Sequence, residues 1–293
     1  MQATRDRREA STSAALRLRP FESGLGAEVL DLAVADIDES NFPAIYAAFL
    51  EHQLLLFRDH EVPPAAQVAF ARRFGEVQIH VMSQYHASAY PELYTLSNLD
   101  AAGKPRGEHP DRGTMAWHTD GSWQRVTGQA TMLYAEIVPT TSGGTGFADM
   151  YSAYDALDPT EQAKLATMRA VHNLDFSRNR RHGESPMTEA QRNAVPPVDH
   201  PIVRTHPETG RKCLFLGDHA EYILGMDYDE GRDFIEKLNA RAIATARNYT
   251  HRWQPRDLMV WDNRCLMHKA ESYDTAREAR VIRRCTVLGE VPR

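Results

Sequence analysis

The stretch Trp117-His118-Thr119-Asp120 decides how this chain is organised, together with the distant stretch Trp261-Asp262-Asn263-Arg264-Cys265-Leu266-Met267-His268. Successive side chains of a strand point to opposite faces, so His118 and Asp120 would present an imidazole and a carboxylate to the same point. If His268 meets them, two imidazoles and one carboxylate lie on one side of a metal ion and leave its other side open. That arrangement is typical of non-haem Fe(II) sites that react with oxygen.

A His-x-Asp pair is a weak signal in a chain with 13 histidines, and the alternative interpretation is a surface histidine beside a solvated aspartate. The surrounding sequence favours the metal site. His268 follows a Met-Val-Trp strand and an Asp-Asn turn, which could deliver a distant ligand to the same barrel mouth.

Arg280 and Arg284 are four residues apart on a predicted strand and therefore share a face. Inward-pointing arginines are costly unless each meets an anion, and the planar guanidinium matches carboxylates well. The site therefore calls for at least one carboxylate ligand beside the metal. The alternative is that both arginines form surface salt bridges with Glu271, Asp274 or Glu278.

The composition of the 293 residues, with 25% charged and 42% hydrophobic side chains, is typical of a soluble globular protein. A net charge of −6 argues against a general nucleic-acid surface, and no apolar run approaches the roughly 20 residues of a membrane span. Cys213, Cys265 and Cys285 form no CxxC pair and are odd in number, which indicates neither a disulfide framework nor a thiolate zinc site. We expect a cytoplasmic protein with a flexible tail at 1–15 and one domain at 16–293.

Strand and helix patterns alternate over the first 75 residues, which predicts helices packed outside a sheet. The run at 54–57 is typical of a strand buried on both faces. Helices are expected at 38–51, 63–74, 151–168 and 230–247, and strands at 16–18, 54–57, 93–96, 130–138, 145–150, 201–205, 212–216, 258–261 and 280–288. The pattern weakens at 77–113 and 172–198, here called the first and second loop segments, which we predict to be lids over the site.

Taken together, the motifs resemble the Fe(II)- and 2-oxoglutarate-dependent dioxygenases typified by taurine dioxygenase and 2,4-dichlorophenoxyacetate dioxygenase. The resemblance runs from about residue 24 to residue 289 and rests on FG at 74–75, WHTD at 117–120, GGT at 143–145 before FADM at 147–150, HPETGR at 206–211, WDNR at 261–264 with His268, and the segment 280–284. The stretches at 189–198 and 203–206 are closer to the phenoxyacetate branch. The implied fold is mainly β, a double-stranded β-helix of the jelly-roll, cupin-like type, with outer helices and long active-site loops.

The resemblance implies a cofactor and two co-substrates. His118, Asp120 and His268 would bind Fe(II), and 2-oxoglutarate and O2 would be the co-substrates. Arg280 would hold the distal carboxylate of 2-oxoglutarate, and Thr145 would donate a hydrogen bond to it.

For the primary substrate, the resemblance points to Arg284 as the residue that meets its anionic end. His80 matches a position that contacts the substrate anion in the taurine enzyme, although a solvated histidine is the alternative. The chain departs from the family pattern in a shortened Gly-Gly-x-Thr motif and in one extra residue between His268 and Arg280. Arg277 and Arg283 are therefore alternative arginines.

The same resemblance implies hydroxylation rather than halogenation, because related halogenases lack the carboxylate that Asp120 supplies. We expect a small anionic substrate, an aryloxyacetate such as 2,4-dichlorophenoxyacetate, which would yield a phenol and glyoxylate while 2-oxoglutarate yields succinate and CO2. Trp123, Met82, Tyr85 and Phe176 are candidates for the ring pocket, or else core residues.

Two other functions stay open. A dioxygenase of this family would alternatively act on a sulfonate, an alkyl sulfate or a natural-product carboxylate. The alternative of another class is a non-catalytic metal-binding sensor of small anions. We expect no nucleic-acid or membrane partner, and a homo-oligomer is left open.

Overall fold

The computed structural model describes residues 16–83, 86–87 and 89–293. The predicted tail at 1–15 and the pocket candidate Tyr85 lie outside the described residues. Among these residues, the large sheet has the strand order β1-β2-β3-β14-β6-β16-β5-β4, and smaller sheets have the orders β13-β7-β15, β12-β8-β9 and β10-β11. Strands β2 and β3 pair in parallel, whereas β14, β6 and β16 at the centre pair antiparallel.

The strands of the large sheet are β1 (Arg17–Pro20), β2 (Ala27–Leu30), β3 (Leu54–Phe57), β4 (His86–Ala87), β5 (Tyr90–Ser97), β6 (Gly128–Ile137), β14 (Leu258–Asp262) and β16 (Val281–Leu288). The facing small sheet contains β7 (Thr145–Asp149), β13 (Asn248–His251) and β15 (Leu266–Ala270). The remaining strands are β8 (Arg169–His172), β9 (Val198–Pro201), β10 (Val203–Thr205), β11 (Lys212–Leu214) and β12 (Ala220–Ile223).

Strand β3 separates two hydrophobic cores. Leu54 and Leu56 face the inner core, which also contains residues of the small sheet, whereas Leu55 and Phe57 face the outer core beneath two helices. All four side chains are at most 1% exposed. The prediction of a strand buried on both faces at 54–57 is therefore confirmed.

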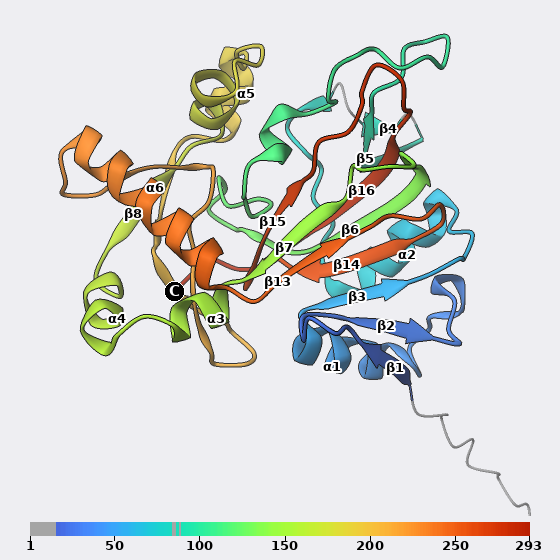
Figure 1. The fold of residues 1–293 in the computed structure, drawn as a ribbon, viewed down its shortest axis with the longest axis horizontal. Coiled ribbons are helices and arrows are strands. Elements are labelled where there is room, and N and C mark those ends of the chain that lie inside the picture. Colours follow the sequence, from blue (N-terminus) through green and yellow to red (C-terminus); the bar gives the residue numbers. More distant parts are fainter. Residues whose placement is uncertain (1–15, 84–85, 88) are drawn as a thin grey trace, which may run out of the picture.

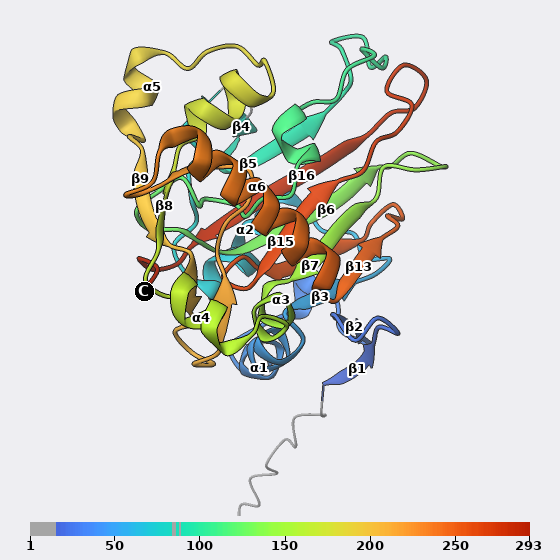
Figure 2. The same ribbon diagram turned by 60° about the vertical axis from the view of Figure 1, so that its left-hand side comes forward.

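Helices cover the sheets from outside (Figures 1 and 2). Helices α1 (Phe42–His52) and α2 (Pro64–Phe74) lie against the large sheet, and α6 (Tyr228–Thr245) lies beside β12 and α3 (Met150–Asp155). Phe74 of α2 packs edge to face on Phe49 of α1, with 5.1 Å between ring centroids. Two facing sheets with outer helices form the predicted double-stranded β-helix fold.

The single helix predicted at 151–168 is wrong, because the chain forms α3 and then α4 (Pro159–Leu165). Pro159 has no N–H and cannot continue the preceding helix. Asp158 instead starts a new one, since its side chain accepts a hydrogen bond from the Glu161 backbone N–H at 3.0 Å. Helix α1 likewise begins at Phe42 rather than at 38, because the Asp38 side chain closes a turn on the N–H of Ser40.

Both loop segments contain short elements. The first carries β4, β5 and the 3-10 helix η3 (Arg112–Met115), and the second carries the π-helix η4 (Phe176–Arg181) and α5 (Glu189–Ala194); a further 3-10 helix, η1 (Val34–Asp36), precedes α1. Helices η3 and η4 lie in contact, so the two segments meet. Their role as lids and the single domain at 16–293 stay predictions. None of the helices among the described residues combines the length and apolarity that a membrane crossing needs.

Candidate active site

His118 and His268 are cross-strand partners. His118 forms an isolated antiparallel bridge with His268 of β15, in which each N–H donates to the other carbonyl, at 3.0 and 2.9 Å. Directly opposed side chains of such a pair lie on one face, and the two imidazole centroids are 4.2 Å apart. The predicted strand at 118–120 reduces to this bridge, because Asp120 already begins a turn.

Asp120 reaches the same point through that turn. Gly121 has a φ of +71°, and a Cβ added to Gly128 of β6 would lie 2.6 Å from the Asp120 carbonyl oxygen, so both positions favour glycine. The carboxylate oxygens of Asp120 lie 3.7 Å from His118 Nε2 and 3.7 Å from His268 Nε2. One ligand atom from each of these three buried residues lies within 4.8 Å of the others.

The protonation of these groups suits a metal ion. His118 Nδ1 lies 2.8 Å from the Ala116 carbonyl oxygen, which keeps the proton on Nδ1 and leaves the Nε2 lone pair free. Burial lowers the pKa of His268 well below 6.5. Burial opposes ionisation of Asp120, but the Arg284 guanidinium, both imidazoles and the Thr131 hydroxyl hold the pKa of that carboxyl below its usual range. An ionised carboxylate and a neutral imidazole are the forms that bind metals.

A cavity of about 340 Å³ adjoins this cluster and is lined by His118, His268, Thr145, Arg280 and Arg284. Arg280 is 2% exposed, and its Nε has no hydrogen-bond partner among the described residues. The Thr145 hydroxyl accepts a hydrogen bond from the indole N–H of Trp253 at 2.9 Å. Because indole can only donate, the Thr145 hydroxyl keeps its own proton for another acceptor. The cavity thus offers donors to an anion.

The alternative of surface salt bridges for the two predicted arginines is wrong, since Arg280 and Arg284 are 2% and 9% exposed. The alternative arginines lie elsewhere. The Arg277 side chain is 86% exposed beside Asp274, and Arg283 forms an ion pair with Glu136 at 2.9 Å on the opposite face of β16.

A second cavity, of about 500 Å³, shares His118 and Arg284 with the first and is also lined by Asp120. Both loop segments contribute to its wall, through His80 and Asp111 of the first and Arg178 of the second. Sequence reasoning missed Asp111 and Arg178, because neither lies in a recognisable motif. Arg178 is buried and Asp111 is half-buried where the two loop segments meet.

The residues predicted for the ring pocket fall into two groups, those that line the second cavity and those that do not. Trp123 lines the second cavity together with Leu174. Met82 packs beside Trp123 in a small hydrophobic cluster, and Phe176 is buried beneath the Arg232 guanidinium, 4.8 Å from its ring centroid. Neither Met82 nor Phe176 lines the second cavity, and both are buried.

His80 and Arg284 lie at the junction of the site. His80 Nδ1 accepts a hydrogen bond from the Met82 N–H at 3.1 Å, which places the imidazole proton on Nε2. Burial, with the nearby charge of Arg284, lowers the pKa of His80 to about 3. The Arg284 guanidinium donates to Asp120 Oδ1 at 3.2 Å. A neutral donor and a cation thus flank the second cavity.

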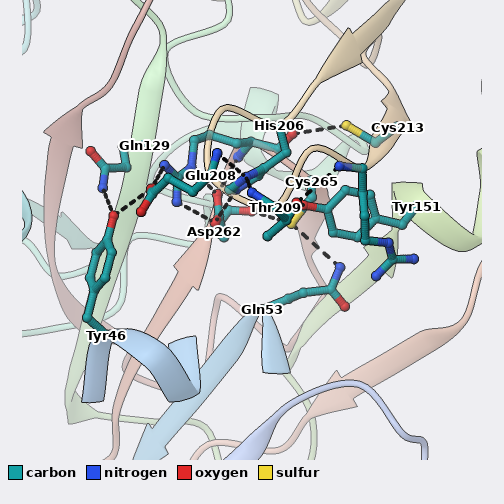
Figure 3. Close-up of polar contacts among 12 residues, drawn as sticks. Tyr46, Gln53, Gln129, Tyr151, His206, Glu208, Thr209, Cys213, Asp262 and Cys265 are labelled. Atoms are coloured by element: carbon teal, nitrogen blue, oxygen red, sulfur yellow. Dashed lines mark hydrogen bonds and ion pairs between the residues drawn. The ribbon is translucent and has the colours of Figure 1, made fainter. Parts of the chain in front are cut away.

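The turn that leads into β15 is fixed by a buried polar network (Figure 3). Asp262 accepts two hydrogen bonds from the Arg264 guanidinium, at 2.9 and 2.8 Å, and lies 3.0 Å from His206 Nε2. Arg264 also contacts Glu208 at 2.5 Å, and Glu208 accepts from the Tyr46 hydroxyl at 2.7 Å. These contacts give the HPETGR and WDNR motifs a structural role, because they hold the turn that precedes His268.

A facing pair of sheets, a buried His-Asp-His cluster and an adjoining anion cavity define a non-haem, metal-dependent oxygenase. A sequence model described as "Taurine catabolism dioxygenase TauD, TfdA family" matches residues 17–286. The chain belongs to this family and is therefore an Fe(II)- and 2-oxoglutarate-dependent dioxygenase.

Similar proteins place the chain near enzymes of aryloxy acids. It is 38% identical over 275 residues to an alpha-ketoglutarate-dependent 2,4-dichlorophenoxyacetate dioxygenase of Cupriavidus pinatubonensis, covering 90% of this chain and 94% of that protein. It is 34% identical over 278 residues to an (S)-phenoxypropionate/alpha-ketoglutarate-dioxygenase of Sphingobium herbicidovorans, covering 91% and 93%. The crystal structure of AAD-2 in complex with Mn(II) and N-oxalylglycine superposes with a TM-score of 0.83 at 31% identity, covering 94% and 99%.

Proposed function

We propose that this dioxygenase binds Fe(II) through His118, Asp120 and His268 and hydroxylates a small anionic substrate, most specifically an aryloxyacetate. The observation that carries the co-substrate part of the proposal is Arg280, whose buried guanidinium has an unpartnered Nε in the cavity beside the metal cluster. A buried charge of this kind is costly without an anion. The carboxylate of a co-substrate that also reaches the metal would supply one.

The three predicted ligands suit Fe(II), since two imidazoles and one carboxylate leave positions open for other ligands. When bound, the iron supplies O2 activation coupled to the oxidative decarboxylation of 2-oxoglutarate to succinate and CO2. The protein keeps these ligands in place by the bridge between His118 and His268 and by the turn at Gly121.

We assign the cavity of about 340 Å³ to 2-oxoglutarate. Arg280 would pair with its distal carboxylate, because planar guanidinium groups bind carboxylates through two parallel hydrogen bonds. Thr145 would donate its free hydroxyl proton to the same co-substrate, since Trp253 already occupies one of its lone pairs.

The second cavity would hold the primary substrate. Arg284 lines both cavities, and we assign it to the substrate anion, with the His80 N–H as a second donor. Trp123 and Leu174 would contact an aromatic ring. Hydroxylation of an aryloxyacetate beside the ether oxygen gives a hemiacetal that releases a phenol and glyoxylate.

The test is a substrate panel with purified protein, Fe(II), ascorbate and oxygen, read by succinate formation. Aryloxyacetates should give succinate, glyoxylate and the phenol in equal amounts. Succinate with a sulfonate, an alkyl sulfate or another carboxylate instead would move the substrate to the alternative class. Metal binding without oxygen consumption for any compound would favour the small-anion sensor.

The setting of the protein is also inferred. We propose a reducing cytoplasm, supported by three buried cysteines that are all free. Homo-oligomer formation stays a prediction, to be measured by light scattering.

A further inference from the structure

A row of buried side chains runs across the large sheet behind Asp120. In the strand register, Thr131 of β6 lies opposite Trp261 of β14 on one side and opposite Thr286 of β16 on the other. Asn263 follows β14, and its backbone N–H donates to the Gln129 carbonyl at 2.8 Å. Trp261 and Thr131 are 0% exposed, and Asn263 is 1% exposed. Water therefore does not compete for their hydrogen bonds.

The side chains of this row form a chain of hydrogen bonds in which each donates to the next, ending at the Asp120 carboxylate. The Trp261 indole N–H donates to Asn263 Oδ1 at 2.9 Å, and Asn263 Nδ2 donates to the Thr131 hydroxyl at 2.9 Å. The Thr131 hydroxyl donates to Asp120 Oδ2 at 2.7 Å. Indole has a proton to donate and no lone pair to offer, so it fixes which end of the Asn263 amide faces Thr131. As a result the hydroxyl proton of Thr131 is directed to the carboxylate.

Among the described residues, two side chains donate hydrogen bonds to the carboxylate of Asp120, namely Arg284 at 3.2 Å and Thr131 at 2.7 Å. Arg284 also lines the cavity assigned to the primary substrate, so its contact with Asp120 competes with a substrate anion. Thr131 is fixed in the sheet and has no such second task. Thr131 lines neither cavity, so a bound anion does not compete for its hydrogen bond to Asp120.

We propose that Thr131 and Asn263 are positioning residues that orient the Asp120 carboxylate for metal binding, with Trp261 setting the direction of the hydrogen bonds. This inference rests on the proposed function, because it takes Asp120 as a metal ligand. Trp261 also contacts the ring of His268, with 4.6 Å between ring centroids. The row therefore connects two of the three assigned ligands, because it runs from Asp120 to a ring contact with His268.

The experiment measures Co(II) binding without 2-oxoglutarate, by ligand-field absorption and competition with a chelator. Thr131→Val keeps the shape of the side chain and removes the hydroxyl, and Thr131→Ser keeps the hydroxyl. Mutation of a residue that hydrogen-bonds to a metal ligand typically lowers metal affinity by about 10- to 100-fold. We expect a loss of that size and an altered Co(II) spectrum for Thr131→Val, and near-normal binding for Thr131→Ser. Asn263→Leu should weaken binding in the same direction.

Thr286→Val is the matched control, since its hydroxyl lies 3.1 Å from that of Thr131 in the same row. It should leave Co(II) affinity unchanged, although it also removes a buried hydroxyl from the row and should lower the thermal stability of the metal-free protein. Wild-type affinity and spectrum in folded Thr131→Val would overturn the inference while leaving the proposed function intact. If Thr131→Val does not fold, unchanged affinity in Asn263→Leu decides against it. Absence of Co(II) binding by the unaltered protein would overturn both proposals.

Discussion

Replacing Arg280 by methionine tests two effects of the buried guanidinium separately. One is the free energy that burial of its charge costs, and the other is the affinity for 2-oxoglutarate that it supplies. Burial lowers the pKa of Arg280 from 12.5 to about 10. This corresponds to a cost on the order of 3 kcal/mol for keeping the side chain charged without an anion. The side chain stays protonated at neutral pH, because its lowered pKa is still far above 7. An anionic co-substrate recovers that free energy when it pairs with the guanidinium on binding. A methionine at this position offers no charge with which the co-substrate could pair.

We therefore expect Arg280→Met to weaken 2-oxoglutarate binding by about 3 kcal/mol, or roughly a hundredfold in Kd. Without 2-oxoglutarate, the free energy of unfolding should stay the same or increase, because methionine fills similar space without an unpaired charge. Calorimetric titration of 2-oxoglutarate into the anaerobic Mn(II)-loaded protein measures the first quantity. Denaturant unfolding of the metal-free protein measures the second.

Arg277→Met is the matched control, since the same substitution removes a side chain that is 86% exposed. It should change neither 2-oxoglutarate affinity nor stability appreciably. The reasoning is refuted if Arg280→Met binds 2-oxoglutarate as tightly as the unaltered protein. It is also refuted if this variant loses several kcal/mol of stability without ligand, as expected for a guanidinium that is already paired.

Three further perturbations test the remaining assignments. Asp120→Ala should abolish Co(II) binding in calorimetry, because one of three ligands is lost; retained binding contradicts the assignment. Arg284→Ala should raise the KM for the primary substrate with little effect on the KM for 2-oxoglutarate, and the reverse pattern would mean that Arg280 and Arg284 exchange roles. The hydrogen bond to Asp218, 2.8 Å long, raises the pKa of His182 above 6.5. The stabilisation that the protonated His182 contributes through this pair is complete below pH 6.5 and is lost as the pH rises through the raised pKa. Amide hydrogen exchange of the second loop segment, corrected for intrinsic rates, should therefore increase over that pH range. The His182→Gln variant should lack this dependence.

Much of the fold follows from local pattern. The continuous apolar run at 54–57 predicts a strand buried on both faces, and β3 divides its side chains between two cores. Apolar periodicity also predicts α2 and α6 to within a few residues. It fails at Pro159, where an apolar stripe continues across a residue that strongly disfavours a helix interior. Backbone chemistry overrides side-chain pattern there.

Local sequence pattern also predicts only part of the candidate active site. The spacing of Arg280 and Arg284 predicts a shared face, and both line one cavity. The strand argument correctly predicts that His118 and Asp120 lie close together. Its reason is partly wrong, because Asp120 lies in a turn whose course depends on two glycines. Asp111, Arg178 and the donors behind Asp120 carry no local signal.

The sequence by itself determined the family, the ligand types and the pair of inward arginines, since these depend on residue identity and on spacing along single strands. The tertiary structure alone decided that His118 faces His268 across a bridge, that Arg280 is unpaired at Nε whereas Arg283 is paired, and that Thr131 donates a hydrogen bond to Asp120. The physical reason is that these contacts join residues of different strands and turns, and their partners are fixed only when the sheets pack and exclude water.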